Sequence, residues 1–471
     1  MVTVVNYDSS GAATVTEEVA VPDQSGIGAD ELLTFGDFSE IALAEALVQK
    51  YPDVRYVDRW KSFLIWDGKL WAKDETMRMM SRAREICKEA ARQSNDQKKQ
   101  LKRKQTVAAI WDLARSDTHY GTTTEQWDRD PWLLNTSGGI VSLKTGQLQD
   151  HSPEHHMTKI TAVAPGHSCP RWFAFLNQVL DGDKEIIGYL QRYFGYCLTG
   201  LVSEHCLQFL YGTGRNGKGV YINTLRGVMG SYAMTTGMET FTESVGDRHP
   251  TDIASLMGAR FVSAEEVQEG KRWAESKIKM LTGGSPVSAR FMRQNFFEFM
   301  PQFKLCIAGN HKPSLRDVDR AIRDRIQLVP FRVYIEPEKR DKDLEDKLRE
   351  EWPGILQWGI DGCLEWQKIG LAVPEAVREE TAIYFNAQDT FGNWLEESCI
   401  TDDPSAWETP TRLFNSWKAY AKECNVGPGR SAEFNDRLDA KGFRYGRDNS
   451  RGRYWQRIKL KAEPVDGPFG R

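Results

Sequence analysis

The feature that most constrains the fold is an apolar segment that runs directly into a glycine-rich loop, CLQFLYGTGRNGKG at residues 206–219. A short apolar run bounded by a turn signal predicts a buried strand. Gly212, Gly214 and Gly217 let the backbone turn where a side chain would obstruct it, and the residues from about Val220 predict a helix. Strand, loop and helix occur here in the order that a phosphate-binding loop requires, so we predict an α/β fold.

The same loop predicts a phosphate-binding site. Backbone N–H groups at the glycine turns form a nest for phosphate oxygens at the start of the helix, and Lys218 supplies a compact cation. Because strand, loop and helix occur in the required order, we favour this function over an ordinary glycine-rich turn. The candidate nucleotide-binding residues are Gly212, Gly214, Asn216, Gly217, Lys218, Gly219 and Val220.

Gly219 departs from the usual phosphate loop, in which a Ser or Thr hydroxyl at that position binds magnesium. Mg²⁺ keeps several waters and needs only one or two carboxylates from the protein. We therefore expect the missing hydroxyl to weaken the motif without abolishing it.

Two acidic residues follow a second predicted strand. In ARFVSAEEV, residues 259–267, Phe261 and Val262 continue an apolar run, and Glu265 and Glu266 stand at its end. One carboxylate can hold magnesium through water while the other orients the attacking water. Paired glutamates are common on surfaces, but their place after a phosphate loop predicts a catalytic and metal-binding role for both.

Two further segments predict groups that act on the outer phosphate. The strand-like run FKLCIAGNHKP places Asn310 at its end, where the amide can touch the γ-phosphate or the attacking water. DRAIRDRIQLVPF places Arg323 and Arg325 before another strand, where an arginine can reach the phosphate of a neighbouring subunit. A surface ion pair with Asp319 or Asp324 is the alternative, and it stays open above all for Arg323.

The composition is that of a water-soluble chain with several domains. Its 471 residues favour two to four domains, and no apolar run approaches the roughly 18 residues of a membrane span. The first thirty residues contain acids but no Lys or Arg, which argues against a secretory signal or a transit peptide. We therefore expect a cytoplasmic protein.

Disulfide and zinc sites are not predicted. The eight cysteines stand singly and form no C-x-x-C pair, so we interpret them as reduced packing residues. His151, His155 and His156 lie on a polar stretch without nearby acids. We interpret them as exposed residues and not as metal ligands.

The chain before the loop mixes helical and strand patterns. Residues 1–30 have no sustained periodicity and predict a flexible tail. Residues 54–72 predict a small sheet with a turn at Asp67 and Gly68, and residues 131–148 predict a hairpin-like β segment. A long polar helix is predicted over about 74–116. Its basic run, which we interpret as a solvated face, comprises Lys98, Lys99, Lys102, Arg103 and Lys104.

The composition changes after about residue 395. Between Thr411 and Lys461, thirteen Lys or Arg stand against five acids, a local net charge of +8 in a chain whose total is −4. Such a concentration of cations is typical of a nucleic-acid contact. Two helical patterns followed by two strand patterns and a basic, glycine-containing turn resemble a winged helix. The DNA-binding candidates are Arg437 on a helix and Arg447, Arg451 and Arg453 on the wing, with a merely solvated basic domain as the alternative.

Taken in order, GTGRNGKG, SAEE, KMLTGGSPVSARFMRQNFFEF, AGNHKP and RDRIQLVPF closely resemble the superfamily 3 helicase module of phage and plasmid primase-helicases, a poxvirus-like family. RYVDRWKSFLIWDGKLW, PWLLNTSGGIVSLKTGQL and RYFGYCLTG resemble the domain that precedes the motor in that family, so the resemblance covers about residues 31–395. It implies an AAA+ motor that assembles as a ring, usually a hexamer, and moves on DNA with ATP and Mg²⁺ as cofactors.

Carried over residue by residue, the resemblance makes Lys218 the phosphate-loop lysine, Glu266 the hydrolytic glutamate, Asn310 the sensor and Arg325 the preferred arginine finger. It also assigns ARFMRQNFFEF to a hairpin that projects into the ring channel. The residues that become candidates for gripping nucleic acid are Lys279, Arg290, Arg293, Gln294 and Phe296. Alternating basic and aromatic residues suit this role, since cations track phosphates and aromatic rings stack on bases; an ordinary surface hairpin is the alternative.

The sequence departs from the family in two further respects. Ser285 stands where an aspartate commonly follows the Gly-Gly pair, which leaves the contacts at the base of the hairpin open. Full-length relatives often carry a polymerising primase domain ahead of this region, and a primase site needs clustered carboxylates for two metals. Only about thirty tail-like residues precede the resemblance here, so we expect no primase active site in this chain.

The predicted fold class is thus α/β, with an AAA+ P-loop NTPase core, an α+β N-terminal domain and a C-terminal winged-helix domain. The expected parts are a tail (1–30), an N-terminal domain (31–168), a helical connector (169–200), the motor (201–395) and a basic DNA-binding domain (396–471).

The predicted function is that of an ATP-dependent, ring-forming DNA helicase of phage or mobile-element replication. It would act on single-stranded and forked DNA in the cytoplasm of a bacterial host, without a membrane and alongside a separate primase or other replication proteins. The alternatives are an origin-binding initiator that melts DNA and a nucleotide-dependent DNA-binding scaffold without productive hydrolysis.

Overall fold

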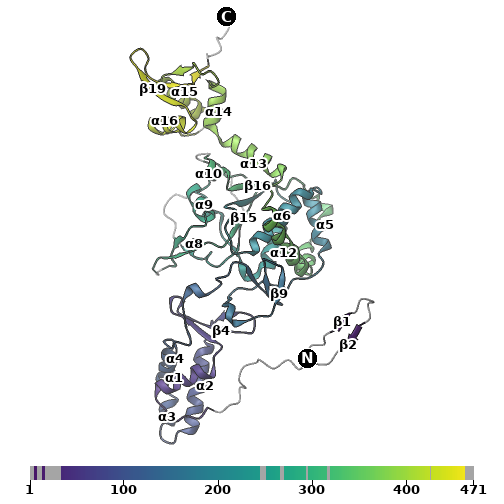
Figure 1. Ribbon diagram of the computed structural model, residues 1–471, viewed down its shortest axis with the longest axis vertical. Helices are drawn as coiled ribbons and strands as arrows, with labels where there is room; N and C mark the ends of the chain where they lie inside the picture. The colour runs from purple at the N-terminus through teal and green to yellow at the C-terminus, as the bar shows by residue number, and fades with distance from the viewer. Residues whose placement is uncertain are drawn as a thin grey trace. The chain divides into compact units, whose positions relative to one another are not determined.

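The computed structural model of the protein (Figure 1) describes residues 5–7, 13–15, 33–243, 251–265, 270–292, 295–315, 319–424 and 426–461. The chain forms two compact units. Unit 1 comprises Met1–Asp67 and Trp71–Trp127, and unit 2 comprises Gly68–Leu70 and Asp128–Arg471. Residues 128–168, which the sequence analysis grouped with the N-terminal domain, therefore lie in the unit that holds the phosphate loop. No helix in these described ranges is long and apolar enough to cross a membrane.

The segment predicted as a flexible tail contains two short strands. β1 (Val5–Tyr7) pairs with β2 (Ala13–Val15) in an antiparallel ladder. These two strands lie within the segment predicted as a flexible tail. The rest of residues 1–32 lies outside the described residues.

Unit 1 packs a group of helices against one face of a four-stranded sheet. The helices are α1 (Glu40–Lys50), α2 (Arg78–Gln93), α3 (Lys98–Leu101) and α4 (Lys104–Ala114). The strands are β3 (Val54–Val57), β4 (Ser62–Trp66), β5 (Trp71–Lys73) and β6 (Gly121–Thr122), in the order β5-β4-β3-β6, with short 3₁₀ turns at η1 (Asp58–Trp60) and η2 (Thr124–Gln126). Because side chains alternate along a strand, Phe63 and Ile65 join the helix core while Leu64 packs with Trp71 and Trp127 on the opposite face.

The long helix predicted over 74–116 is broken into α2, α3 and α4. Ser94 ends α2 in an extended conformation, and its hydroxyl accepts a hydrogen bond from the Gln97 N–H at 3.0 Å. A serine that binds a nearby backbone N–H competes with helix continuation, which explains the break. The basic run from Lys98 to Lys104 is exposed across this break, as predicted for a solvated face.

Unit 2 contains a three-stranded antiparallel sheet and a five-stranded parallel sheet. β7 (Leu133–Thr136), β8 (Gly139–Ser142) and β9 (Gln147–Gln149) form the predicted hairpin-like segment. The parallel sheet contains β10 (Leu207–Tyr211), β11 (Ala233–Thr235), β12 (Phe261–Ala264), β15 (Lys304–Gly309) and β16 (Ile326–Pro330). Its strand order is β11-β12-β15-β10-β16, and every neighbouring pair is parallel.

Helices connect and cover these strands. They are α5 (Pro170–Val179), α6 (Lys184–Leu198), α7 (Lys218–Met229), α8 (Thr251–Ala254), α9 (Glu275–Thr282), α10 (Arg320–Arg323), α11 (Leu344–Arg349), α12 (Trp352–Ile369) and α13 (Glu375–Gln388). The 3₁₀ turns are η3 (Pro153–His155), η4 (Gly230–Tyr232), η5 (Met238–Thr240) and η6 (Pro337–Lys339). α5 and α6 confirm the helices predicted over 169–200.

The parallel sheet has an apolar core on each face. Leu210 packs into one core with residues of α6, α7 and α12, and its neighbour Phe209 packs into the other with Trp273 and Tyr384. α6 and α12 cross closely, because a Cβ atom built on Gly195 would lie only 2.1 Å from the backbone nitrogen of Cys363. The two helices therefore pack directly on each other, beside the parallel sheet (Figure 1).

Two buried cations bind the carboxyl end of α6. Arg260, at the start of β12, donates to the Leu198 carbonyl at 2.6 Å, and Lys304, at the start of β15, donates to the carbonyls of Thr199 and Leu201. Burial lowers the pKa of Lys304 to about 7. Cations at a helix carboxyl end offset the negative end of its dipole, which explains how Arg260 and Lys304 hold α6 against the sheet.

The carboxyl-terminal lobe has its own core. Its elements are α14 (Thr390–Ser398), β17 (Cys399–Ile400), β18 (Trp407–Glu408), α15 (Pro410–Glu423), α16 (Ser431–Ala440), β19 (Arg444–Asp448), β20 (Gly452–Gln456) and β21 (Lys459–Leu460). Trp394, Trp417, Phe434 and Trp455 pack together in this core. Two helices followed by the β19–β20 hairpin match the element order predicted from the sequence.

Candidate nucleotide and nucleic-acid sites

The glycine-rich loop joins the carboxyl end of β10 to α7, which begins at Lys218, two residues earlier than the pattern from Val220 suggested. A Cβ atom built on Gly212 would lie 2.0 Å from Nδ2 of Asn216 and 2.2 Å from the carbonyl oxygen of Phe331. Gly217 has a φ of 85°, and a Cβ atom there would lie 2.6 Å from Val179. The sequence therefore needs glycine at these two positions for this tight loop to form.

Lys218 is held at the centre of the loop. Its Nζ donates to the Gly212 carbonyl at 2.9 Å, to Oδ1 of Asn216 at 3.0 Å and to Oδ1 of Asn310 at 3.1 Å. All three acceptors are neutral, so the ammonium charge is not cancelled by these bonds. Burial lowers the pKa of Lys218 to about 8. An ammonium group held this way is suited to receive a polyanion.

Asn310 stands at the carboxyl end of β15, next to the loop, as predicted. Its side-chain atoms lie 3.8 Å from a Cβ atom built on Gly214. The amide of Asn216 in turn donates to the Phe331 carbonyl at 2.8 Å, directly after β16. The ends of three neighbouring strands, β10, β15 and β16, thus meet at one site.

Glu265 brings a carboxylate to the first turn of α7. It follows β12, is half-buried, and its Oε2 lies 4.0 Å from a Cβ atom built on Gly219. The space where a Ser or Thr hydroxyl would lie therefore faces a carboxylate oxygen, the kind of ligand that Mg²⁺ prefers. Glu266, the predicted hydrolytic residue, lies outside the described residues.

Arg323 and Arg325 lie at the other end of the sheet. The Arg325 carbonyl accepts a hydrogen bond from the Leu207 N–H at 2.7 Å, so Arg325 stands where β10 begins and Lys218 stands beyond where it ends. Five strand residues separate the two ends by roughly 15 Å. One copy of the chain does not bring its own Arg325 to its own loop.

The ion pairs of this arginine segment differ from the pairs with Asp319 or Asp324 that the sequence left open. Arg323 pairs with Asp389 at 3.6 Å, and Asp324 pairs with Arg320 at 3.7 Å. Arg325 donates to the Ala321 carbonyl at 2.7 Å. Asp389 is far along the chain from Arg323, which is why the sequence did not indicate this partner.

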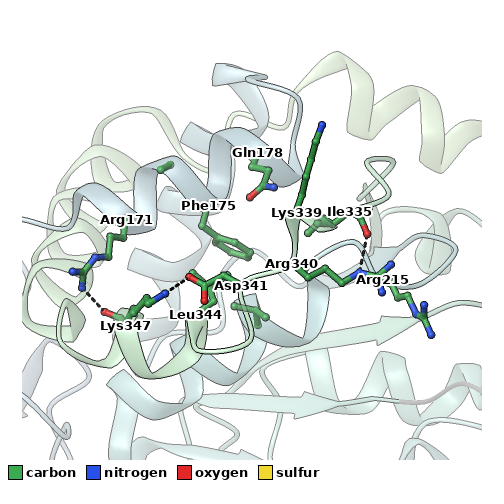
Figure 2. A pocket seen from close by; sticks show the side chains of 13 residues that line it. Arg171, Phe175, Gln178, Arg215, Ile335, Lys339, Arg340, Asp341, Leu344 and Lys347 are labelled. Atoms are coloured by element: carbon green, nitrogen blue, oxygen red, sulfur yellow. Dashed lines mark hydrogen bonds and ion pairs between the residues drawn. The ribbon is translucent and has the colours of Figure 1, made fainter. Parts of the chain in front are cut away.

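A cavity of about 820 Å³ lies beside the loop (Figure 2). Phe175, Val220, Ile335 and Leu344 give it an apolar wall, and Gly217 connects it to the loop. The charged residues at its rim are Arg171, Arg215, Lys339, Arg340, Asp341 and Lys347. This volume lies in the range of small-molecule sites. Sequence reasoning missed the cavity because α5 and the segment before α11 are separated by more than a hundred residues.

The segment predicted as a channel hairpin forms a hairpin. β13 (Val287–Ala289) pairs antiparallel with β14 (Phe297–Phe299). At its tip the Arg290 guanidinium lies 4.7 Å from the centre of the Phe296 ring, and Phe296 is 60% exposed. Arg293 and Gln294 lie outside the described residues. Lys279 forms an ion pair with Asp319.

The basic wing candidates are placed on the β19–β20 hairpin. Arg447 and Arg453 are exposed and directly opposite each other in the ladder. Arg451 is also exposed, and its guanidinium lies 5.2 Å from the centre of the Trp407 ring. Arg437 differs because it is half-buried, with its guanidinium 5.8 Å from the Phe391 ring centre.

The prediction that the three histidines are exposed is wrong. His151 is half-buried, not exposed as predicted, because its Nε2 lies 2.8 Å from the Thr136 carbonyl oxygen. His155 and His156 are half-buried as well. All eight cysteines are free thiols. Across the described ranges, no group of three or more His, Cys, Asp or Glu is arranged to hold a metal.

Comparisons with known proteins find two family models. Residues 44–181 match "D5 N terminal like", and residues 210–325 match "Family of unknown function (DUF5906)". The C-terminal region of NrS-1, a solved structure, is 11% identical and has a TM-score of 0.48, with 90% of this chain and all of that chain covered.

Three curated relatives are viral proteins. A protein of Acanthamoeba polyphaga mimivirus named as a candidate helicase is 22% identical over 301 residues, 59% of this chain and 31% of its own length. A second protein named as a candidate helicase, from Frog virus 3, is 26% identical over 42% of this chain and 22% of its own length. Primase D5 of Fowlpox virus is 30% identical over 31% of this chain and 19% of its own length.

This chain thus spans about a third or less of the length of these curated relatives. The two family models contain most of the motifs that carry the resemblance stated above, although RYFGYCLTG lies between them. Over these two segments the chain is similar to proteins of the poxvirus-like primase-helicase family.

Proposed function

We propose that the chain is an ATP-dependent DNA helicase motor that works as a ring of identical subunits and moves on single-stranded DNA. The observation that carries the proposal is the placement of polar and charged residues at the two ends of the parallel sheet. Lys218, Asn310 and Glu265 converge at its carboxyl end, whereas Arg325 lies at its amino end. A second copy that presents its Arg325 to the first copy's loop completes the site.

The topology of the sheet supports an AAA+ P-loop core. β10 lies between β15 and β16, whereas the chain that leaves β10 continues through α7 to the far edge at β11. Where the connections from neighbouring strands lead to opposite sides of the sheet, a crevice forms at the carboxyl ends of these strands. Ligands of α/β sheets bind in such crevices. The loop residues occupy this crevice.

In this proposal the loop binds the phosphates of ATP. Lys218 and the N–H groups at the start of α7 hold the outer phosphates, and the Asn310 amide contacts the γ-phosphate or the attacking water. Glu265 holds Mg²⁺ through water, and the next residue, Glu266, orients the attacking water. When bound, magnesium neutralises charge between the outer phosphates. Arg325 of the neighbouring copy stabilises the charge of the transferred phosphate.

The cavity beside the loop suits the nucleoside half of ATP. Its apolar wall offers Phe175 for contact with a base, and Arg215 and Arg340 lie at the rim, where the sugar and the inner phosphate would be (Figure 2). Loop and cavity meet at Gly217 and Val220, which line both. One ligand therefore fills both sites.

Two surfaces are proposed to contact DNA. The β13–β14 hairpin presents Arg290 against the exposed Phe296 ring, a pairing of cation and aromatic face that suits single-stranded nucleic acid. The carboxyl-terminal lobe, which we assign as a winged helix, presents Arg447, Arg451 and Arg453 on its hairpin. The hairpin would grip the strand in the channel, and the lobe would load the ring on DNA.

Gly219 favours a second candidate, a nucleotide-dependent DNA-binding scaffold without productive hydrolysis, because the magnesium-binding hydroxyl of the usual loop is missing. An initiator that melts an origin would use the same motor and the same basic lobe. DNA-stimulated hydrolysis separates the scaffold from both motors.

The test is unwinding of forked DNA by purified protein, beside Lys218→Ala and Arg325→Ala. Both variants should lose hydrolysis and unwinding. A mixture of the two should regain part of the activity, because a subunit with an intact loop then meets a neighbour with an intact arginine. Wild-type protein that fails to unwind forks of either polarity, or a mixture without recovery, contradicts the proposal.

A further inference from the structure

The short helix α10 precedes Arg325 and is held at its start by Asp319. Oδ1 of Asp319 accepts a hydrogen bond from the Ile322 N–H at 2.8 Å, and Oδ2 forms an ion pair with Lys279 of α9. Burial alone would raise the pKa of Asp319, but the bonds from Lys279 and Ile322 and the nearby charge of Arg325 lower it. Asp319 thus joins the arginine segment to the helix that leads into the β13–β14 hairpin.

The end of α10 is held by a second carboxylate, Asp389. Its Oδ2 lies 3.6 Å from Nη2 of Arg323 and 3.0 Å from Nζ of Lys441, so one oxygen is shared by two cations. Its Oδ1 accepts a hydrogen bond from the Gly392 N–H at 2.9 Å and caps α14. The Asp389 side chain is only 17% exposed.

The two partners of Asp389 come from different surfaces of the proposed motor. Arg323 ends α10, two residues before Arg325, and its guanidinium also lies 5.6 Å from the Phe385 ring centre. Lys441 follows α16 and stands three residues before the wing strand β19. Among the described residues, Asp389 is therefore an ionic link between the basic lobe and the arginine segment.

The structure shows one arrangement of this link, and the shared oxygen leaves room for a second. With Lys441 at 3.0 Å, Arg323 is held at 3.6 Å, beyond ordinary hydrogen-bond length. A DNA phosphate that attracts Lys441 would leave Oδ2 to Arg323 alone and allow their direct bond. A ligand that favours one arrangement over the other is what shifts such an equilibrium.

We propose that Asp389 and Asp319 are positioning residues that set the Arg325 segment according to whether the basic lobe and the hairpin hold DNA. This inference rests on the proposed function. It predicts that DNA contacts made by one surface of a subunit change the rate at which the neighbouring subunit's ATP is cleaved.

The first test compares hydrolysis with and without forked DNA in wild type, Asp389→Asn and Lys441→Met. Removal of the Lys441 ammonium imitates the DNA-bound arrangement, so Lys441→Met should raise hydrolysis in the absence of DNA. Asp389→Asn should reduce the stimulation by DNA at least fivefold, with DNA affinity changed less than twofold. The double variant should resemble Asp389→Asn, because the link is then missing.

A matched control is Glu375→Gln, which removes the exposed pair between Glu375 and Arg378 on α13. It should leave the stimulation by DNA at the wild-type value. If Asp389→Asn lowers stimulation only as far as it lowers DNA affinity, or if Lys441→Met has no effect without DNA, the inference is overturned.

The second test separates this inference from the proposed function. Hydrogen exchange of residues 319–326 is measured in full-length protein with and without forked DNA. DNA should change the protection of these amides in wild type and not in Asp389→Asn. Unchanged protection in wild type overturns the inference whatever the hydrolysis rates, whereas a change in protection without any hydrolysis refutes the proposed motor alone.

Discussion

Arg447 and Arg453 are direct partners in the β19–β20 ladder, so two exposed guanidinium groups share one face of the hairpin. Like charges placed opposite each other destabilise a ladder. Asp448, the acid of this hairpin, is engaged in its turn, where it accepts hydrogen bonds from the N–H groups of Ser450 and Arg451. The DNA proposed to bind this hairpin would relieve the repulsion between the two cations.

The double change Arg447→Gln and Arg453→Gln should weaken binding to duplex DNA about tenfold at moderate salt. It should also reduce the slope of log affinity against log salt by about 1 to 2, since each lost phosphate contact removes about 0.9. Thermal stability should not fall, because a repulsive pair is removed. Arg437→Gln is the control, because Arg437 packs on Phe391, and it should keep the wild-type salt slope.

Gly219 leaves room beside Glu265, so a hydroxyl can be restored. Gly219→Ser should raise the affinity for magnesium in the presence of nucleotide and increase hydrolysis by about twofold to tenfold. Gly219→Ala is the control, because alanine also favours the helix more than glycine but carries no hydroxyl. It should stabilise α7 by up to about 1 kcal/mol without raising hydrolysis. Equal hydrolysis by the Ser and Ala variants would contradict a metal site at this position.

The pKa of Lys218, lowered to about 8 by burial, predicts a pH dependence of nucleotide binding. Phosphates bind the charged ammonium, so affinity should be constant below about pH 7 and fall as pH rises through 8. The fall approaches tenfold per pH unit when one proton is linked to binding. Calorimetry from pH 6.5 to 9.5 checks it, and Lys218→Met should bind weakly without this dependence. A flat wild-type profile would show that Lys218 does not meet the phosphates.

Phe175 predicts a contact with the base inside the cavity. Phe175→Leu keeps an apolar side chain but removes the ring face, so the Kd for ATP should rise about tenfold, in line with the roughly 1–3 kcal/mol of base–aromatic stacking. Binding of inorganic triphosphate should not change. Phe173→Leu is the matched control on the same helix, because Phe173 is exposed and lies outside the cavity lining. An equal loss for triphosphate would refute a nucleoside site.

Lys304 predicts that stability depends on pH. Its pKa in the folded protein is about 7, below the value near 10.4 of an unfolded lysine, so the unfolded chain binds more protons between these limits. The free energy of unfolding should therefore rise with pH in this window, by up to about 1.4 kcal/mol per pH unit. Urea unfolding at pH 7 and 9 should show a smaller rise for Lys304→Met than for wild type. Lys61→Met, at an exposed lysine, should behave like wild type.

The sequence predicted the elements whose signals are local. The apolar run before Gly212, the glycines of the loop and the run before Asn310 each predict a strand or turn from a few neighbouring residues, and the structure has them. The order of elements in the basic lobe was predicted for the same reason, whereas the hairpin at 287–299 was expected from the resemblance. Side-chain chemistry confined to one short segment is therefore accessible from sequence.

Features that join distant segments were not accessible. The cavity combines Phe175 with Leu344, and the shared carboxylate combines Asp389 with Arg323 and Lys441. The helix over 74–116 was predicted as continuous because its polar residues suit an exposed helix, while the competing bond from Gln97 to Ser94 depends on local geometry. Periodicity reports burial along a helix but not where a side chain interrupts it.

The separation of Lys218 and Arg325 by the length of a strand has a consequence for how activity depends on protein concentration. A solitary molecule would hold every group for gripping a nucleotide and lack the one needed to cleave it. The rate of hydrolysis per molecule should then fall on dilution even while nucleotide remains saturating. The protein would be inactive wherever its concentration is too low for copies to associate.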